Sequence, residues 1–310
     1  MSSRFTVLAS GSSGNASLLQ TPRGGLLLDC GLPPQELSQR LDKIGVSWSA
    51  VNAVVITHTH SDHWNRYTLE HLRRLSIPLY AHPQHQAFLT SVPAFLPLQR
   101  AKLVNDYLPG VEFHPIPQLC CMAVHVPHDS DPTFAIRCNS APNAEGNGWS
   151  VGLASDLGTL TQDFLNLFAG VDVLAIEFNH DERLERSSRR PRFLVNRVLS
   201  DLGHLSNTQA AEAVRLLADA IAPHHLQAVV QLHLSRECNT ADLAQAAARS
   251  LWEHAPQKCV RIITAKQHEP VESVVLNAGP QRAVRVPVLA ATVEPKPRMN
   301  QLILPGMDDA

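Results

Sequence analysis

The stretch "VVITHTHSDH", Val54–His63, places three histidines and one aspartate directly after an apolar run. The apolar run predicts a buried strand. Strand alternation would put His58 and His60 on one side, and a break in the chain after them would let Asp62 and His63 turn back toward the same space. Imidazole and carboxylate groups form a ligand set that suits zinc or manganese. We therefore predict a metal site at the end of this strand, against the alternative of a surface loop that is merely rich in histidine.

Composition sets wide limits on the protein class. The chain has 310 residues, of which 44% are hydrophobic, enough to bury one sizeable core or two modest ones. The formal net charge of −2 neither favours nor excludes a nucleic acid partner. No apolar segment is long enough to cross a bilayer, and the start lacks the apolar middle of a signal peptide, so we expect a cytoplasmic protein without membrane partners. The six cysteines include no CxxC pair, so we expect reduced thiols.

The periodicity along the chain predicts two groups of strands, each followed by helices. The start reads as three antiparallel strands, and a strand–helix–strand crossover follows the first helix. Predicted strands cover 4–10, 16–21, 24–31, 50–60, 77–82, 111–119, 122–128, 132–138, 148–156, 171–181 and 226–235, and predicted helices lie within 33–46, 67–76, 206–221 and 240–255. This pattern suits an α/β protein with two sheets between helices. We expect one domain over 1–290 and a flexible tail at 291–310.

Three later residues complete the histidine motif. His128 in "HVPHDS", Asp156 in "GLASDLG" and His233 in "VVQLHLS" each follow a predicted strand. The HxHxDH motif at 58–63, followed along the chain by these three residues, resembles the metallo-β-lactamase family. This resemblance implies a four-layer αββα sandwich that holds two divalent metal ions, zinc or manganese. The resemblance assigns His58, His60 and His128 to one ion, Asp62, His63 and His233 to the other, and Asp156 to a bridge between them. His125 is the alternative to His128, and Asp29 is expected to order the histidine loop.

Other motifs narrow the resemblance. The segments "VLASGSSGNASLL", "EFNHD" and "LSDLGHLSNTQAAEAV" resemble the WalJ (YycJ) family of bacterial proteins, which are related to nucleases and phosphodiesterases. "GHLSN" also resembles a motif of the tRNA-processing nuclease RNase Z and of the phosphodiesterase PhnP. This resemblance implies that His204 contacts the scissile phosphate or protonates the leaving oxygen, so that His204 and Asp62 are the expected catalytic residues. The alternative is a histidine in the loop that caps the following helix.

Further polar residues are candidates for substrate binding. Ser12, Ser13 and Asn15 lie in a Gly/Ser loop that offers donors to an anion, although an ordinary hairpin turn explains the loop equally well. Asn179 and His180 follow a predicted buried strand and are expected to position substrate or a metal ligand. The charged run 181–192 reads as a solvated loop, with Arg186, Arg189, Arg190 and Arg192 as alternative phosphate contacts.

These resemblances imply a metal-dependent phosphodiesterase that uses a metal-bridging hydroxide, and most specifically a 5′ to 3′ DNA exonuclease. The alternatives are a phosphodiesterase of small, including cyclic, molecules, a hydrolase of thioesters, lactones or lactams, or a metal-binding module without turnover. In the tail, the segment Gln301–Leu304 resembles peptides that dock on the bacterial sliding clamp, although Pro305 departs from that pattern and a disordered end is the alternative.

Overall fold

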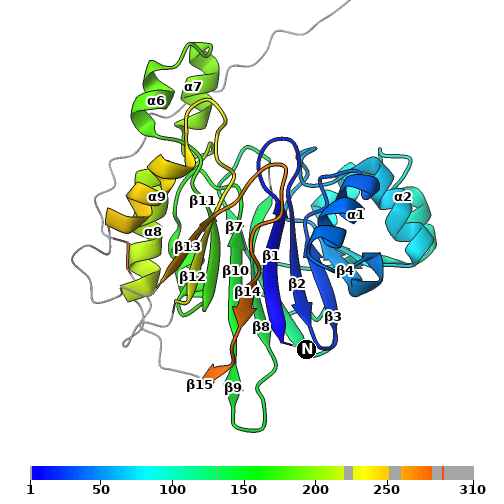
Figure 1. The fold of residues 1–310 in the computed structure, drawn as a ribbon. Coiled ribbons are helices and arrows are strands. Elements are labelled where there is room, and N and C mark those ends of the chain that lie inside the picture. Colours follow the sequence, from blue (N-terminus) through cyan, green and yellow to red (C-terminus); the bar gives the residue numbers. More distant parts are fainter. Residues whose placement is uncertain (1, 131, 220–225, 251–259, 281–287, 290–310) are drawn as a thin grey trace, which may run out of the picture.

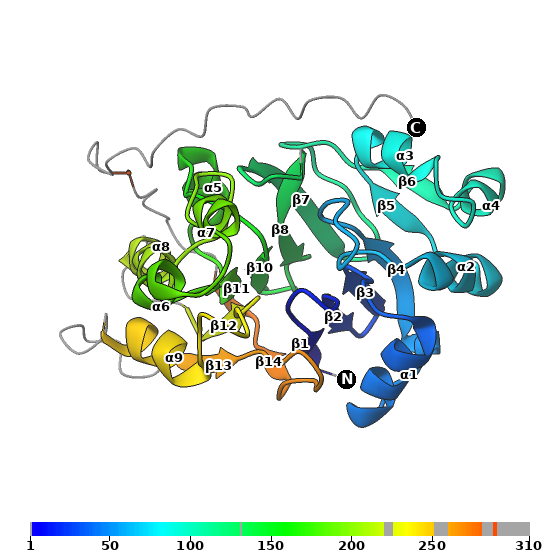
Figure 2. The ribbon, with the colours of Figure 1, turned by 90° about the horizontal axis from the view of Figure 1, so that it is seen from above.

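The computed structural model describes residues 2–130, 132–219, 226–250, 260–280 and 288–289. Two sheets pack face to face, and helices cover the outer face of each (Figures 1 and 2). This arrangement confirms the predicted four-layer αββα sandwich. The predicted tail, with its clamp-like segment, lies outside the described residues, and the domain boundary at 290 stays a prediction.

The first sheet has an antiparallel start and a parallel continuation. Its strands are β1 (Ser3–Ala9), β2 (Ala16–Thr21), β3 (Gly24–Leu28), β4 (Val51–Val55), β5 (Leu79–Ala81), β6 (Val104–Asp106) and β14 (Val274–Leu276), in the order β14-β1-β2-β3-β4-β5-β6. β1, β2 and β3 pair antiparallel, and β3 to β6 pair parallel. The predicted antiparallel start and strand–helix–strand crossover are thus confirmed.

The second sheet has strands that are buried on both faces. It contains β7 (Leu119–Val126), β8 (Thr133–Ser140), β10 (Ser150–Ala154), β11 (Val173–Glu177), β12 (Ala228–Leu232) and β13 (Arg261–Thr264), in the order β13-β12-β11-β10-β8-β7. Every residue of β10, β11 and β12 is buried, which is why these parallel strands are apolar apart from Ser150, Glu177 and Gln231. The short strands β9 (Asn147–Gly148) and β15 (Gly279–Pro280) pair separately.

Helices α1 to α4 cover the first sheet, and α5, α8 and α9 cover the second (Figure 2). Their bounds are α1 Pro34–Lys43, α2 Arg66–Leu75, α3 Pro83–Leu89, α4 Leu96–Arg100, α5 Gln162–Phe168, α8 Asn207–Asp219 and α9 Ala241–Ser250, and a 3-10 turn spans Trp48–Ala50. Leu37 and Leu41 of α1, four residues apart on one face, are fully buried against the first sheet. A third apolar cluster draws on both sheets, with Phe5 of β1 and Ile136 of β8 among its members, and holds the two halves together.

Three differences between the structure and the sequence-based expectation lie close to the predicted site residues or to the strands that lead to them. The predicted strand at 111–119 is a loop, since Pro115 and Pro117 cannot donate to a sheet, and β7 begins only at Leu119. β4 ends at Val55, so His58 and His60 lie in the following loop and not on the strand itself. The charged run at 181–192 belongs largely to helices α6 (Glu182–Ser187) and α7 (Arg192–Val198), which project from one end of the sandwich (Figure 1).

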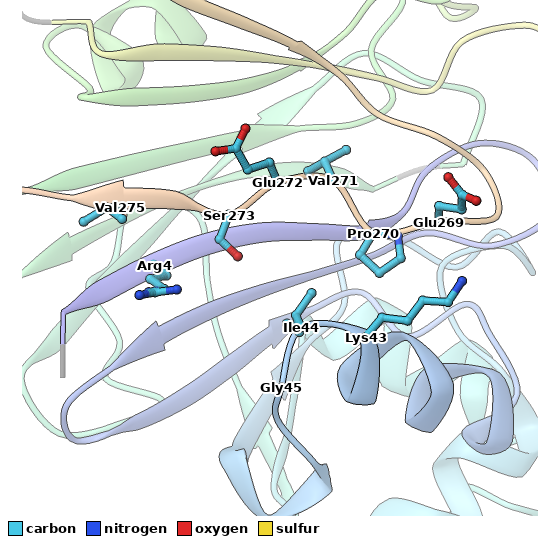
Figure 3. A pocket seen from close by; sticks show the side chains of 10 residues that line it. All are labelled: Arg4, Lys43, Ile44, Gly45, Glu269, Pro270, Val271, Glu272, Ser273 and Val275. Atoms are coloured by element: carbon cyan, nitrogen blue, oxygen red, sulfur yellow. The ribbon is translucent and has the colours of Figure 1, made fainter.

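A wide hollow of about 790 Å³ lies where the segment before β14 crosses β1 near the end of α1 (Figure 3). Its charged side chains are of both signs, and Glu269 and Glu272 are already paired, with Lys266 and Arg261. None of the predicted metal ligands lines this hollow. The predicted chemistry therefore belongs elsewhere in the molecule.

Candidate active site

Two histidines of the β4–α2 loop meet a histidine from the end of β7. The ring centroids of His58 and His60 are 5.0 Å apart, and those of His60 and His128 are 5.1 Å apart. One ring nitrogen from each of the three residues lies within 4.8 Å of the others. The structure therefore brings together the three predicted ligands of the first ion. It places His128, and not His125, in this group, because His125 is an exposed residue of β7.

The remaining predicted ligands gather beside this group around one buried carboxylate. Asp156 Oδ2 lies 2.9 Å from His63 Nε2, and Asp156 Oδ1 lies 3.0 Å from His233 Nδ1. Asp62 Oδ2 lies 3.6 Å from His63 Nε2 and 3.5 Å from His233 Nε2. Asp156 also forms a group with His58 and His63 in which the ligand atoms lie within 4.8 Å of one another. Its contacts on both sides match the bridging position that we predict for it.

The hydrogen bonds of the histidines test whether these residues fit metal ions. His63 Nδ1 donates to Asp29 Oδ2 at 2.8 Å, and His128 Nδ1 donates to the Gly203 carbonyl at 2.9 Å. His58 Nδ1 donates to Thr57 Oγ1, whose own hydrogen points to Asp29. A donated Nδ1 hydrogen leaves Nε2 as the atom with a free electron pair.

Several Nε2 atoms indeed have no hydrogen-bond partner. The Nε2 atoms of His58, His128 and His233 are buried and make no hydrogen bond to any described residue. Burying a polar atom without a partner is costly, and a divalent cation at this place would remove that cost. The donor set therefore fits zinc or manganese, as the sequence predicts.

The charges of His58, His60, His128 and Asp156 suit cation binding. Burial lowers the pKa of His58 well below its usual value, and burial is likewise the main reason that the pKa of His60 and of His128 is lowered. These imidazoles are thus neutral, the form that binds metal. Burial alone would raise the pKa of Asp156, but His233 and His63 beside it bring that pKa well below its usual value, so the carboxylate is ionised.

Removal of divalent ions should destabilise the fold, because the orphaned nitrogens and the buried carboxylates would lose their partner. We expect EDTA to lower the midpoint of thermal unfolding by about 5–10 °C, as follows from a ligand held at about 100 times its dissociation constant. Differential scanning calorimetry with and without EDTA measures this shift, and Zn²⁺ or Mn²⁺ should reverse it. An unchanged midpoint in EDTA would contradict the presence of a metal site.

Asp29 holds the histidine loop in place. It sits directly after β3 with a left-handed backbone (φ 61°) and is buried. Its carboxylate accepts the Thr57 backbone N–H at 2.8 Å as well as the His63 ring hydrogen. Among the described hydrogen bonds, those of the Asp29 carboxylate go to Thr57 and to His63 Nδ1 in the histidine loop, and none goes to an Nε2 atom of the predicted metal ligands. It therefore has the ordering position that we predict.

The Gly/Ser loop between β1 and β2 supports the cluster from the other side. Asn15 is buried, and its amide donates to Asp62 Oδ2 at 3.0 Å and contacts His63 Nε2 at 3.0 Å. Asn15 thus holds two of the predicted ligands and is not an open donor to an anion. Ser12 and Ser13 are exposed at the tip of the same loop and line a cavity of about 420 Å³ beside the cluster.

Gly31 allows this loop and the histidine loop to pack closely. A Cβ atom at Gly31 would lie 1.8 Å from the Asp62 carbonyl oxygen and 2.9 Å from the Asn15 nitrogen, so backbone must move to accept it. We expect Gly31→Ala to lower the free energy of unfolding by about 2 kcal/mol or more and to displace Asp62.

Urea denaturation together with metal titration measures both effects of Gly31→Ala. Gly148→Ala is the matched control, because its Cβ would come no nearer than 3.2 Å to the Ser140 Oγ and 3.6 Å to the Ser140 carbonyl oxygen. Equal stability and equal metal affinity in the two variants would contradict the close packing of the loops.

Glu177 is a site residue that sequence reasoning did not identify. It ends β11, is fully buried, and its Oε1 lies 2.6 Å from His204 Nδ1 and 3.2 Å from His233 Nδ1. Its Oε2 accepts the backbone N–H groups of Leu157 and Leu205. A glutamate that closes an otherwise apolar strand is the sequence signal that could have revealed it, since an ionised group is seldom buried without a partner.

His204 lies between Glu177 and the cavity. Its ring is partly buried, its Nδ1 donates to Glu177, and the same nitrogen is 3.6 Å from Asp156 Oδ1. Burial acts to lower the pKa of His204, but the charge and the hydrogen bond of Glu177 outweigh burial and raise that pKa above its usual value. The contact with Glu177 thus favours the protonated form of His204 next to the cluster of metal ligands.

The other predicted substrate residues have structural contacts. Asn179 lines the cavity, but its amide donates to the His233 carbonyl at 2.8 Å and so fixes the loop that carries this histidine. His180 is buried, pairs through its backbone with Ser206, and does not line the cavity. Of the four arginines named above as alternative phosphate contacts, Arg190 lines the cavity and pairs with Glu185 and Glu237. Arg197 of α7, which sequence reasoning did not single out, pairs with Asp129 beside His60 and His128.

Comparison with known proteins agrees with this fold. Residues 26–226 match the β-lactamase superfamily domain. The chain is 29% identical over 252 residues to the exodeoxyribonuclease WalJ of Streptococcus pneumoniae, covering 78% of this chain and 85% of that protein. It is 27% identical over 254 residues to the exodeoxyribonuclease YycJ of Bacillus anthracis, covering 82% and 90%.

A solved structure shows the same fold. The short form of human tRNase Z superposes with a TM-score of 0.57 at 16% identity, covering 87% of this chain and 98% of that one. These findings confirm the resemblances drawn from the motifs. Matched over most of its length and carrying clustered histidine and aspartate ligands, the chain belongs to the β-lactamase superfamily, has the metallo-β-lactamase fold and is a metal-dependent hydrolase.

Proposed function

We propose that the protein is a DNA exonuclease that cleaves phosphodiester bonds in the 5′ to 3′ direction with two divalent ions, zinc or manganese. The observation that carries this proposal is the His204–Glu177 pair, in which His204 lines the same cavity as the predicted ligand His233 and Glu177 holds the His204 Nδ1 from behind. A protonated histidine at this place serves a reaction that expels an alkoxide, as phosphodiester cleavage does. The similarity to two proteins named exodeoxyribonucleases supports DNA as the substrate, and we propose a cytoplasmic location on the same ground.

Different residues of the chain would bind the metal ions, donate a proton and contact the substrate in this reaction. Bound divalent ions would supply a water of lowered pKa and hold the phosphate oxygens. His58, His60 and His128 would bind one ion, Asp62, His63 and His233 the other, and Asp156 both. His204 would donate its Nε2 proton to the leaving oxygen, because Glu177 occupies its Nδ1. Ser13 and its neighbour Ser12 line the cavity where a strand would enter.

A phosphodiesterase of small molecules is the second candidate function. The cavity of about 420 Å³ favours it, because this volume lies near the lower end of the range of about 300–1,000 Å³ for small-molecule sites. Hydrolysis of thioesters, lactones or lactams is less well supported, since such substrates require neither the His204–Glu177 pair nor the serine loop.

A panel of substrates decides between these functions. Initial rates should be measured with Mn²⁺ or Zn²⁺ on double- and single-stranded DNA, RNA, a cyclic nucleotide, a thioester and a β-lactam. We expect DNA to be hydrolysed fastest. Fastest hydrolysis of the cyclic nucleotide would replace the proposal with the second candidate, and turnover of the thioester or lactam alone would overturn both.

None of the helices in the described parts of the chain is long and apolar enough to cross a membrane.

A further inference from the structure

One arginine beside the candidate active site has no carboxylate partner among the described residues. Arg236 lies in the loop after β12, three residues beyond His233, and lines the cavity that also includes His204. Its Nη2 donates to Ser13 Oγ and lies 3.5 Å from Gln267 Oε1. Both partners are neutral oxygens. The charge of Arg236 is therefore not balanced by the surrounding protein.

The other charged groups of the cavity are balanced. Arg190 pairs with Glu237 at 3.1 Å and with the buried Glu185 at 3.2 Å. Arg197 pairs with Asp129. Glu237 is the neighbour of Arg236 in the chain, but its carboxylate points to Arg190. An anion that enters the cavity would thus find Arg236 as a cation that no described carboxylate competes for.

The part of the cavity wall beside Arg236 is held in a fixed shape by hydrogen bonds within the protein. Gln267 accepts the Ser13 backbone N–H at 3.1 Å and donates to the Gly14 carbonyl at 3.1 Å, so it ties the tip of the β1–β2 loop to the segment after β13. Gly11 has φ of 127°, and a Cβ atom there would lie 2.5 Å from Gln267 Oε1. The loop therefore has a fixed shape that presents the Ser13 hydroxyl beside the Arg236 guanidinium. Donors held in place before binding lose little entropy when a ligand arrives.

The elements around the cavity come from distant parts of the chain. The β1–β2 loop, the loop between β12 and α9, and the α6–α7 pair all lie at the same end of the sandwich, opposite the N-terminus (Figure 1). Leu194 and Val198 of α7 add apolar side chains to the lining. The cavity thus combines the Arg236 guanidinium and the Ser13 hydroxyl on one part of its wall with the apolar side chains of α7, which suit contact with a sugar ring.

We propose that Arg236 and Ser13 form a subsite for a non-scissile phosphate, namely the phosphate one nucleotide away from the one at the ligand cluster. The planar guanidinium fork matches phosphate oxygens, and an exposed hydroxyl adds a further donor. The inference rests on the proposed function in that it takes the substrate to be a chain of phosphodiesters. The inference goes beyond the proposed function by naming the residue that binds the neighbouring phosphate.

Dinucleotides that differ by one phosphate test the subsite. The KM values for TpT, pTpT and TpTp should be measured for the wild-type protein and for Arg236→Gln, Arg236→Lys and Arg73→Gln. Arg73, an exposed residue of α2 without a described ion pair, is the matched control for the loss of one surface charge. Calorimetric binding of the same dinucleotides in EDTA gives a second readout that does not depend on turnover.

The wild-type protein should prefer one of the two phosphorylated dinucleotides over TpT by about 10-fold, the value of one charge-assisted hydrogen bond. Arg236→Gln should abolish this preference, Arg236→Lys should retain part of it, and Arg73→Gln should retain all of it. A wild-type protein without preference, or a preference that survives in Arg236→Gln, would overturn the subsite. If intact DNA is not cleaved while the Arg236-dependent preference persists, the subsite stands and the exonuclease proposal fails.

Discussion

Replacing Asp156 with alanine should reduce DNA hydrolysis by at least about 10³-fold, because the loss of the carboxylate between the two ligand groups removes several kcal/mol of transition-state stabilisation by metal ions. Asp156 is buried between His63 and His233, and no other described carboxylate reaches both histidines at 3.0 Å or less. The measurement is the initial rate on DNA, together with the metal content of the purified variant by mass spectrometry. We expect the variant to hold less metal than the wild-type protein.

Asp163→Ala is the matched control for this experiment. Asp163 is an exposed aspartate in the first turn of α5 and contacts none of the predicted ligands. Its replacement should leave the rate and the metal content as they are in the wild-type protein. Full activity of Asp156→Ala with full metal content would show that the predicted bridge does not exist.

Replacing His204 with alanine should slow DNA hydrolysis by about 10²–10³-fold, within the range for the loss of a general acid. The effect should depend on the leaving group, since p-nitrophenolate departs without a proton whereas a nucleoside alkoxide does not. Hydrolysis of bis(p-nitrophenyl) phosphate by the same variant should therefore fall by less than about 10-fold. The ratio of the two losses is the measured quantity.

The leaving-group ratio separates a proton donor from a residue that only supports the loop. A structural defect in His204→Ala would slow both substrates equally, which would contradict the assigned role. His114→Ala, at an exposed histidine between β6 and β7, is the control and should slow neither substrate. Glu177→Gln should show a weaker form of the same ratio, because the carboxylate raises the pKa of His204 and orients its ring.

The sequence predicted the layers of the fold because apolar runs and helical spacing are local signals. β11 and β12 are apolar apart from Glu177 and Gln231, and they form strands as predicted, although their parallel pairing was not predicted. β14 was not predicted, since its three residues acquire strand geometry only by pairing with β1, which lies about 270 residues earlier in the chain. α6 was read as a loop because its charged residues carry no apolar period, although Asp181 caps it through two backbone N–H groups.

The residues that the structure gathers into the candidate ligand cluster could be predicted from the sequence, because a compact motif and three strand ends carry them. Of the residues that support this cluster, Asp29 was predicted, but the others were not. Glu177 and Asp129 act through contacts with histidines far away in the chain, and Arg236 became notable only when its lack of a carboxylate partner was visible. Asn15 and Asn179 appeared as donors to substrate, but in the structure their amides hold Asp62 and the loop of His233.

The most direct test of the central claim is digestion of a DNA duplex labelled at either its 5′ or its 3′ end. The wild-type protein should be compared with and without EDTA, in the presence of Mn²⁺ or Zn²⁺. We predict metal-dependent degradation in which the 5′ label is released first as a short product while the 3′-labelled strand shortens progressively. Intact DNA under all conditions, or equal degradation in EDTA, would contradict a metal-dependent exonuclease.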